Sequence, residues 1–325
     1  MGQTAQLSST IGEAFGPAVA ISGDTIVVGG GGKDGGYAYV FVKPAGGWTN
    51  MTETALLSDG LTGNYFGGSV AIDGGTIVVG ATGAVINGNV DQGAAYVFVK
   101  PATGWATTSE FDAQLTASDG TFEDFFGLSL GVSGDTVVAG APYFEYRTGP
   151  GAAYVFVEPT TGWASMTQTA ELTESVQGLY DEFGIAVAIS GNTVVAGASQ
   201  ANNNAGAAYV FAEPATGWAN MTETAELTTS ESIAHLGWSM GISGRQVVVG
   251  TSGGSSYPAF VYAEPVGGWQ STSTASLVLK GGQPQALFGY SVAIGSGVVA
   301  AGAPDQTEKG AANQGVAFGF ELTPP

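Results

Sequence analysis

The side chain best suited to acid–base chemistry near neutral pH is His235, the only histidine in the 325 residues. Glu231 and Ser232 lie close to it in the sequence. A nucleophilic triad, however, needs a base that a carboxylate orients towards a serine, and no nucleophile-elbow motif is present. Paired carboxylates for glycoside cleavage stay open, because their separation in space cannot be read from a sequence. We predict a protein without catalytic residues.

A second type of chemistry is metal binding by oxygen ligands. Asn87, Asn89 and Asp91 alternate along one short polar stretch, and Asp305 lies in the corresponding stretch near the end of the chain. Calcium takes six to eight oxygen ligands, usually with several carboxylates from one loop. Asn and Asp are also the usual residues of tight turns. The alternatives are therefore a weak calcium site and ordinary polar turns. The absence of cysteine excludes thiolate sites and disulfides.

Acidic residues dominate the charge: 27 Asp and Glu face 7 Lys and Arg, which gives a formal net charge of −20. Such a surface repels nucleic acid and anionic membranes. Cations, basic proteins and neutral glycans remain as partners, and acidity that only keeps the protein soluble is the alternative. The densest acidic group is Asp119, Glu123, Asp124 and Glu145, which we predict to be a ligand-binding group on exposed loops.

Five tryptophans recur at one position after a Pro-x-x-Gly turn. They are Trp48, Trp105, Trp163, Trp218 and Trp269. An exposed indole ring can stack on a sugar, so glycan binding is one interpretation. The position at the start of an outer strand favours the other interpretation, packing of one repeat against its neighbour.

These residues are embedded in an internal repeat. Six steps, five Phe-Gly and one Leu-Gly, are spaced by 51 to 60 residues: Phe15-Gly16, Phe66-Gly67, Phe126-Gly127, Phe183-Gly184, Leu236-Gly237 and Phe288-Gly289. Each begins four short β-type segments; in the third copy they are 126–132, 136–142, 153–157 and 169–172. Four-stranded units at this period predict an all-β, six-bladed β-propeller with four antiparallel strands per blade, forming one domain over residues 1–325.

The two ends of the sequence complement each other. Residues 4–7 match the closing segment of a repeat but precede the first Phe-Gly step, and the last repeat ends near residue 320 without a closing segment. We predict that the N-terminal strand completes the sixth blade and closes the ring.

The Phe-Gly step followed by Gly-Ala-Pro, at Gly140-Ala141-Pro142 and Gly302-Ala303-Pro304, resembles the FG-GAP repeat of integrin α-subunits and of bacterial exported proteins. The resemblance covers nearly the whole chain and is closest to the bacterial branch. It implies a propeller that binds ligands through its loops at the cell surface or outside the cell. The integrin calcium loop is missing, because turns such as Ser133-Gly134-Asp135 leave no room for it.

These observations predict a non-catalytic binding or adhesion scaffold that presents acidic loops on one face. A lectin-like propeller and a structural spacer of a larger surface protein are the alternatives. Calcium is the one cofactor that stays open. We expect a monomer that binds a protein or glycan, with no nucleic acid and no membrane insertion, since no stretch approaches the roughly 20 apolar residues of a membrane helix. The first residues lack the pattern of a signal peptide.

Overall fold

A computed structural model describes residues 4–11, 15–32, 35–142, 149–231, 233–253, 258–283, 286–307 and 314–322. The chain divides into two compact units, which are described separately. The first comprises residues 1–139 and 156–169, and the second comprises 140–155 and 170–325, so the division falls within the third repeat. Among the described residues, no helix is long and apolar enough to cross a membrane.

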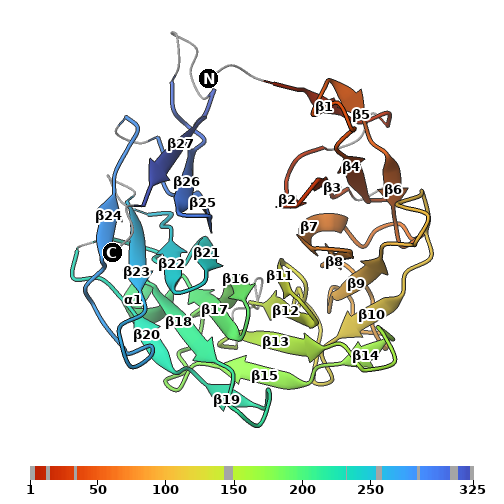
Figure 1. The fold of residues 1–325 in the computed structure, drawn as a ribbon. Helices are drawn as coiled ribbons and strands as arrows, with labels where there is room; N and C mark the ends of the chain where they lie inside the picture. Colours follow the sequence, from red (N-terminus) through yellow and green to blue (C-terminus); the bar gives the residue numbers. More distant parts are fainter. Residues whose placement is uncertain are drawn as a thin grey trace. The chain divides into compact units, whose positions relative to one another are not determined.

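In the first unit, the strands follow the repeats (Figure 1). The sheet of the first repeat has the order β2-β3-β4-β6, and β7 to β10 form that of the second. The strands that begin in this unit are β1 Leu7–Ser8, β2 Val19–Ser22, β3 Thr25–Gly30, β4 Tyr37–Val42, β5 Met51–Thr52, β6 Ala55–Leu57, β7 Phe66–Asp73, β8 Thr76–Ala81, β9 Ala94–Val99, β10 Ala113–Thr116, β11 Ser129–Ser133, β12 Thr136–Ala141 and β14 Met166–Thr167.

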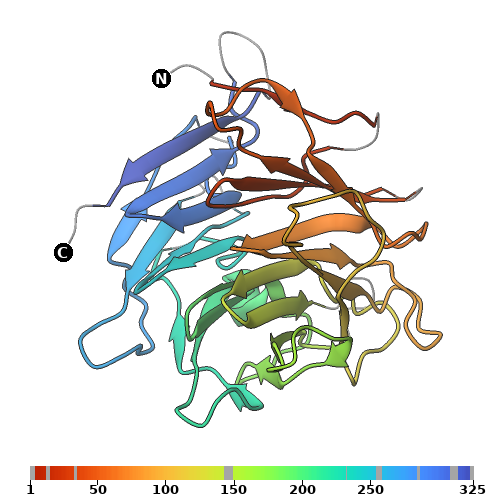
Figure 2. The same ribbon diagram turned by 45° about the vertical axis from the view of Figure 1, so that its right-hand side comes forward.

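The second unit continues the pattern with the sheets β16-β17-β18-β20, β21-β22-β23-β24 and β25-β26-β27. The three strands of the last of these sheets run side by side (blue in Figure 2). The elements are β13 Ala152–Val157, β15 Ala170–Thr173, β16 Phe183–Ser190, β17 Thr193–Ala198, α1 Ala201–Asn204, β18 Ala207–Ala212, β19 Met221–Thr222, β20 Ala225–Leu227, β21 Met240–Ser243, β22 Gln246–Val249, β23 Ala259–Ala263, β24 Leu277–Leu279, β25 Ser291–Gly295, β26 Val298–Ala303 and β27 Val316–Glu321.

In the second and fourth repeats, the phenylalanine of the Phe-Gly step lies at the centre of the repeat's own core. Phe183 is fully buried, and its ring lies 5.6 Å from that of Tyr209 and 5.9 Å from that of Phe211, both on the third strand of the same repeat. Phe66 makes the same contacts with Tyr96 and Phe98 in the second repeat. The contacts of Phe183 with Phe211 and of Phe66 with Phe98 are edge-to-face, an arrangement that adds stability beyond the area it buries.

The glycines of the motif are required by contact between neighbouring repeats. Gly197, on β17, faces the carbonyl oxygen of Gly237 in the next repeat so closely that a Cβ would overlap it. Gly80 meets the carbonyl oxygen of Gly127 in the same way in the first unit. The two recurring features of the repeat, Phe-Gly (Leu-Gly at residues 236–237) and Gly-Ala, therefore meet across the boundary between adjacent sheets.

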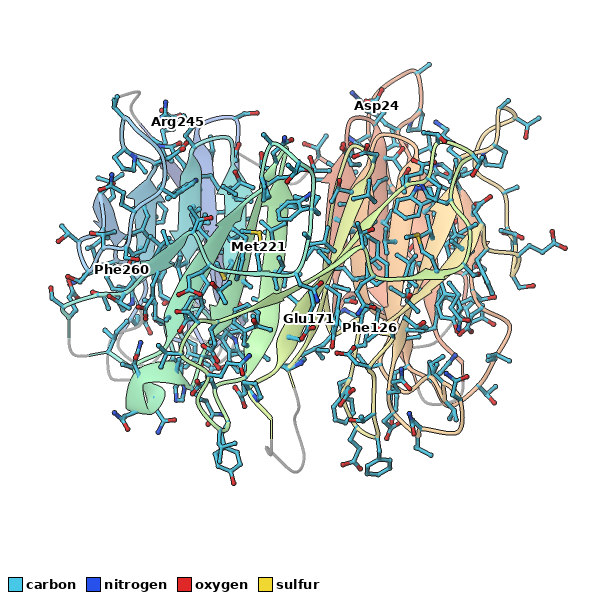
Figure 3. All side chains as sticks on the ribbon, turned by 90° about the horizontal axis from the view of Figure 1, so that it is seen from below. Asp24, Phe126, Glu171, Met221, Arg245 and Phe260 are labelled. Atoms are coloured by element: carbon cyan, nitrogen blue, oxygen red, sulfur yellow. The ribbon has the colours of Figure 1, made fainter. Side chains whose placement is uncertain are left out.

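At three places among the described residues, a short fastening strand pairs in parallel with the outer strand that precedes it. β5, β14 and β19 pair in parallel with the outer strands β1, β10 and β15, in the registers Leu7↔Met51, Leu115↔Met166 and Leu172↔Met221. Figure 3 shows Met221 and Glu171 on one such pair, β19 and β15.

An asparagine strengthens two of these fastenings. Asn220 Oδ1 accepts a hydrogen bond from the Glu171 backbone N–H at 2.9 Å, and Asn50 Oδ1 accepts one from Gln6 at 2.8 Å. The N-terminal strand β1 thus has the register and the bonds of an outer strand, as expected for the strand that completes the sixth repeat. Its pairing with β27 would join the two units and stays a prediction.

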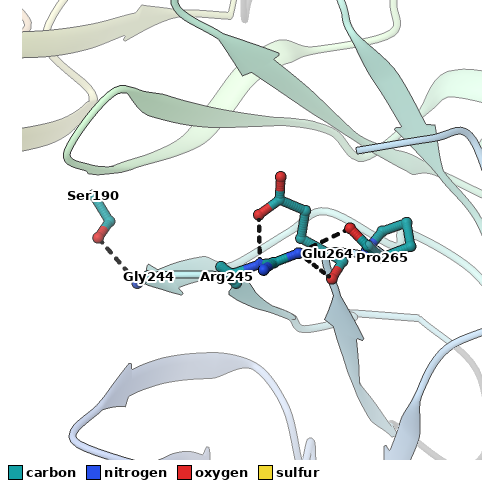
Figure 4. A network of polar contacts seen from close by, with 5 residues as sticks. All are labelled: Ser190, Gly244, Arg245, Glu264 and Pro265. Carbon is teal, nitrogen blue, oxygen red and sulfur yellow. Dashed lines mark hydrogen bonds and ion pairs between the residues drawn. The ribbon is translucent and has the colours of Figure 1, made fainter. Parts of the chain in front are cut away.

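At the opposite end of the sheets from the long loops, the first two strands of each repeat meet in tight turns. In the fifth repeat, Gly244 N–H donates to Ser190 Oγ at 3.1 Å (Figure 4). The guanidinium of Arg245 pairs with the Glu264 carboxylate at 3.0 Å and also donates to the Pro265 carbonyl at 2.9 Å. One of the few cations of the chain is therefore used to hold two turns of one repeat together.

Candidate ligand-binding site

The acidic group predicted on the third repeat does not form one exposed ligand surface. Asp119 is exposed, and Glu123 is half-buried with a positive φ of 61°. Asp124 is only 2% exposed, and it accepts hydrogen bonds from the Thr121 N–H at 2.5 Å and hydroxyl at 2.8 Å. Burial raises its pKa. Asp124 therefore holds its own loop together, and we expect charge reversal there to destabilise the loop. Glu145 lies outside the described residues.

The four predicted metal ligands lie in turns. Asn87 has a φ of 53° and stands in the tight turn closed by the Ile86–Asn89 backbone bonds, the usual geometry of an Asn-Gly turn. Asn89 uses its side-chain N–H groups to donate to Gln92 and to the Gly120 carbonyl. Asp91 also has a positive φ, and Asp305 is exposed. The described residues contain no group of three or more acidic or histidine side chains arranged for a metal.

The repeated tryptophans are mostly core residues. Trp105, Trp163, Trp218 and Trp269 are between 7% and 9% exposed, and Trp48 is partly buried. Trp105 belongs to a cluster that contains Leu57 of the preceding repeat and Phe98 of its own. The predicted packing between repeats is therefore confirmed for this residue, and these buried rings offer little face for a sugar.

His235 has a structural role in its own loop, through its side-chain contact and its backbone conformation. Its Nδ1 lies 3.2 Å from the Ser199 carbonyl oxygen, and its backbone has a positive φ of 59° at the position before Leu236-Gly237. This is the same position in the repeat that Phe125 and Glu182 occupy with φ of 53° and 57°.

A pocket of about 750 Å³ lies in the second unit, among the loops of the fourth repeat. It is formed by the loop that precedes β16, by α1 and by side chains of β18 and β20. Its lining residues are Ser175, Val176, Gln177, Gly178, Leu179, Tyr180, Asp181, Gln200, Ala201, Asn202, Asn203, Asn204, Tyr209, Glu223 and Glu226.

One wall of this pocket is a left-handed turn. Asn202, Asn203 and Asn204 have φ of 55°, 59° and 67°, and all three residues are exposed. Left-handed backbone costs energy even for asparagine and persists where surrounding contacts enforce it. Two such contacts are the bonds from Asn202 Nδ2 to Glu226 at 3.1 Å and from His235 N–H to the Asn204 carbonyl at 2.9 Å.

Most carboxylates of the pocket have hydrogen-bond donors. Glu223 accepts from the Ser175 N–H at 2.8 Å and hydroxyl at 2.5 Å, and Asp181 accepts from the Gly178 N–H at 2.6 Å. Glu182, buried beside them, accepts from Ser199 Oγ at 2.7 Å. These bonds fix the loops that shape the pocket.

Glu174 differs from all of them. It is 2% exposed, and neither of its carboxylate oxygens has a hydrogen-bond partner of good geometry among the described residues. Burial, and secondly the charge of Asp181, raise its pKa to about 8, while the nearby Tyr209 hydroxyl opposes the shift. Burial and the Glu174 charge in turn raise the pKa of Tyr209 well above its usual range. The groups that act on Glu174, namely Asp181, Tyr209 and Glu223, all line the pocket.

In the second repeat, the carboxylate at the equivalent position does have hydrogen-bond donors. Asp59 follows Leu57 as Glu174 follows Leu172, two residues on, and each faces the tyrosine of the third strand, Tyr96 or Tyr209. Asp59 accepts hydrogen bonds from the Leu61 N–H at 3.1 Å and from Asn64 Nδ2. Glu174 has no equivalent of these donors in the described residues, although it is just as buried.

From the sequence, the ligand-binding group is centred on the third repeat, which stays a prediction, and Glu174, Asp181 and Asn202–Asn204 are not singled out. A count of acids per loop selects the third repeat. The informative signal was positional: only two repeats carry an acid two residues after the closing leucine.

The unusual pKa of Glu174 leads to a prediction for Glu174→Gln. The folded carboxyl keeps its proton up to about pH 8, whereas the unfolded one loses it near pH 4.5, so folding stability falls as pH rises between these values. Glutamine cannot lose a proton and escapes this penalty. We expect Glu174→Gln to be more stable than the parent by on the order of 2 kcal/mol at pH 8 and about equal at pH 4.5. Urea unfolding at both pH values measures the difference, and an equal difference at both would contradict the assignment.

Together, the repeated antiparallel sheets place the chain in the all-β class, as a six-bladed β-propeller. A family model described as the FG-GAP repeat matches residues 10–41, 49–98, 110–156 and 166–211, more than half of the chain. The chain belongs to the FG-GAP repeat family, which confirms the family predicted from the Phe-Gly and Gly-Ala-Pro motifs.

One of the similar solved structures supports the fold. The WD40 domain of coronin from Toxoplasma gondii is similar over 93% of this chain and 70% of its own, with a TM-score of 0.53 and 10% identity. The computationally designed Ika4 protein matches 64% of this chain and 97% of its own, with a TM-score of 0.37 and 16% identity. Among curated proteins no match was found.

Proposed function

We propose that this protein is a non-catalytic binding scaffold that takes a ligand in the pocket of the fourth repeat. The observation that carries the proposal is the pocket of about 750 Å³ built from the loops around α1 and before β16. Loops held by a rigid β-scaffold are a common place for binding sites. The size also falls within the range of pockets that hold small molecules or single side chains.

The composition of the pocket indicates which ligands suit it. Asp181, Glu223 and Glu226 line it, and no Lys or Arg of the described residues does. Exposed Leu179 and Tyr180 supply apolar surface beside these carboxylates. We therefore propose a ligand with positive charge and some apolar character, in keeping with the charge of the whole chain. A role outside the cell or at its surface is part of the same proposal.

Weak calcium binding is a secondary part of the proposal. Its support is the local density of carboxylate and amide oxygens from Asp181, Glu223, Glu226 and the three asparagines. A glycan role has less support, because the four best-buried tryptophans cannot present their rings to a sugar.

A cysteine-specific label can test the site, because the chain has no cysteine of its own. We would attach an environment-sensitive fluorophore at Leu179→Cys, a lining position that is 66% exposed. Calcium chloride, a mixture of neutral hexoses and a lysine-containing peptide are then titrated in turn. The proposal expects at least one of them to change the emission in a saturable way.

The matched control carries the same label at Val266→Cys, which is 98% exposed in the turn between β23 and β24, at the other end of its sheet. A change at residue 179 without one at residue 266 supports the pocket. Equal changes at both positions, or none at residue 179 with any of the three probes, would overturn it.

A further inference from the structure

We propose that the second repeat carries a pocket for the methionine side chain of a partner peptide that also bears a basic residue. The pocket has a volume of about 300 Å³, and its lining includes Leu57 of β6 and Phe98, Trp105 and Thr108 of the second repeat. We call it the Trp105 pocket. It lies within the first unit and shares no residue with the pocket of the fourth repeat, so it is a second site beyond the proposed function.

Thr108 stands where three other repeats have a methionine. In those repeats, the residue that pairs in parallel with the leucine of the preceding outer strand is Met51, Met166 or Met221. In the second repeat, the residue paired in parallel with Leu57 is Thr108, and in the fifth repeat Thr272 pairs with Leu227 in the same way. Two repeats therefore have a short side chain where three have a long apolar one.

In the first repeat, the methionine packs into the corresponding place. Met51 is partly buried and packs, together with Leu7 and Trp48, against a cluster that contains Phe41. In the second repeat, the residues equivalent to this leucine, tryptophan and phenylalanine all line the pocket; they are Leu57, Trp105 and Phe98. The Trp105 pocket thus corresponds to the space that a methionine takes in the first repeat.

The fifth repeat has an equivalent pocket, which lies within the second unit and has a volume of about 260 Å³. At the four positions of Leu57, Phe98, Trp105 and Thr108, its lining residues are Leu227, Tyr262, Trp269 and Thr272. The same replacement of methionine by threonine is therefore accompanied by the same kind of pocket in both repeats.

Both repeats also contain one extra residue beside the threonine. Residues 109–111 lie between Thr108 and Asp112, and residues 273–275 lie between Thr272 and Ser276, whereas only residues 52–53 lie between Met51 and Thr54. Asp112, Ser276 and Thr54 are equivalent, because each accepts a hydrogen bond from the last N–H of the third strand of its repeat. The joint recurrence of threonine, extra residue and pocket indicates a built feature rather than a single packing defect.

The lining of the Trp105 pocket suits an apolar side chain. Val99 is 40% exposed and Phe111, one of residues 109–111, is 37% exposed, whereas Phe98 and Trp105 are nearly buried. Methionine is unbranched and flexible, so it fills irregular spaces, and its sulfur makes favourable contacts with aromatic rings. A methionine side chain supplied by a partner therefore matches both the place and its aromatic lining.

The Trp105 pocket also carries negative charge. Glu110 and Asp112 line it and are exposed, and no Lys or Arg of the described residues lines it. At the corresponding positions, the pocket of the fifth repeat has Thr274 and Ser276, and its described lining contains no carboxylate. Charge complementarity therefore favours a basic residue beside the methionine at the Trp105 pocket and not at its counterpart.

Calorimetric titration of the full chain tests the proposal. The probe is a capped peptide Gly-Lys-Met-Gly-Gly, compared with the same peptide carrying serine in place of methionine. Because burial of the methionine side chain contributes much of the affinity, we expect the methionine peptide to bind at least about tenfold more tightly. Comparable binding of the two peptides would overturn the proposal, and this comparison needs no variant of the protein.

The variant Thr108→Met places the chain's own methionine in the pocket. We expect it to be at least as stable as the parent in urea unfolding, and to lose at least about tenfold in affinity for the methionine peptide. Affinity that persists in Thr108→Met would assign the peptide to another place, such as the acidic pocket of the fourth repeat, and would overturn the proposal.

Two matched controls accompany this variant. Thr108→Ser keeps the hydroxyl that accepts a hydrogen bond from the Glu110 N–H at 2.9 Å and leaves the pocket open, so it should bind the peptide as the parent does. Thr272→Met fills the equivalent pocket of the fifth repeat and should leave the tight site unchanged. Loss of affinity in either control equal to that in Thr108→Met would contradict the assignment to the Trp105 pocket.

The charge of the pocket has its own test. Glu110→Gln should weaken binding of the Gly-Lys-Met-Gly-Gly peptide several-fold at low salt, and it should leave binding of a Gly-Gln-Met-Gly-Gly peptide unchanged. Equal effects on the two peptides would overturn the preference for a basic residue. Binding of a hexose that Thr108→Met abolishes, without binding of the methionine peptide, would overturn the proposal in favour of a glycan.

Discussion

Replacing Gly197 by alanine should destabilise the protein by roughly 3 kcal/mol, or prevent folding altogether. The added methyl group would overlap the carbonyl oxygen of Gly237 in the next repeat. The clash is with backbone, so no rotamer change can relieve it, and the sheets of the fourth and fifth repeats would have to separate locally. Urea unfolding followed by circular dichroism measures the change.

The matched control is Gly46→Ala. A Cβ there meets nothing within 4 Å, so we expect a change within about 0.5 kcal/mol. If both variants lose the same stability, the close approach between repeats is not what demands glycine in the motif.

The second large effect is expected for Trp105→Ala, at about 3 to 5 kcal/mol of lost stability. The indole is 8% exposed and lies in one cluster with Leu57 and Phe98, so its removal leaves a cavity between the first two repeats. Thermal unfolding against the control Val266→Ala, which changes an exposed side chain, gives the measurement. A stable Trp105→Ala protein that had lost affinity for a sugar would reverse this interpretation in favour of a lectin.

The repeat architecture was predictable because its signals are local and repeated. Each repeat indicates its strands and turns through Gly-led turns, a continuous apolar run such as β17 and an aromatic run such as β18. These signals recur from repeat to repeat, so each copy supports the others. The fastening strands were not predicted. Two-residue strands such as β19 have no periodicity to detect, and their partner lies about fifty residues away.

The candidate site was harder to predict, because it depends on exceptions to the repeat. Asp124 looks like a loop acid in the sequence but is a buried hydrogen-bond acceptor. Glu174 looks the same in the sequence, but neither of its oxygens has a hydrogen-bond partner of good geometry among the described residues. Only the three-dimensional structure distinguishes a carboxylate that accepts hydrogen bonds from its own loop from one that does not. The left-handed turn at Asn202–Asn204 likewise depends on contacts from distant residues such as Glu226.

The fastening strands also impose an order on the folding of the repeats during synthesis. The outer strands β10 and β15 pair with segments that belong to the following repeat. In the pair of β15 with β19, the hydrogen-bonded residues Glu171 and Asn220 are 49 residues apart. On the ribosome, chain growth runs from the N-terminus, so a repeat that has just emerged must wait for its successor before its outer strand is secured. Each new repeat then supplies the parallel partner of the preceding outer strand. A chain interrupted between repeats would expose an unpaired strand edge, which favours aggregation.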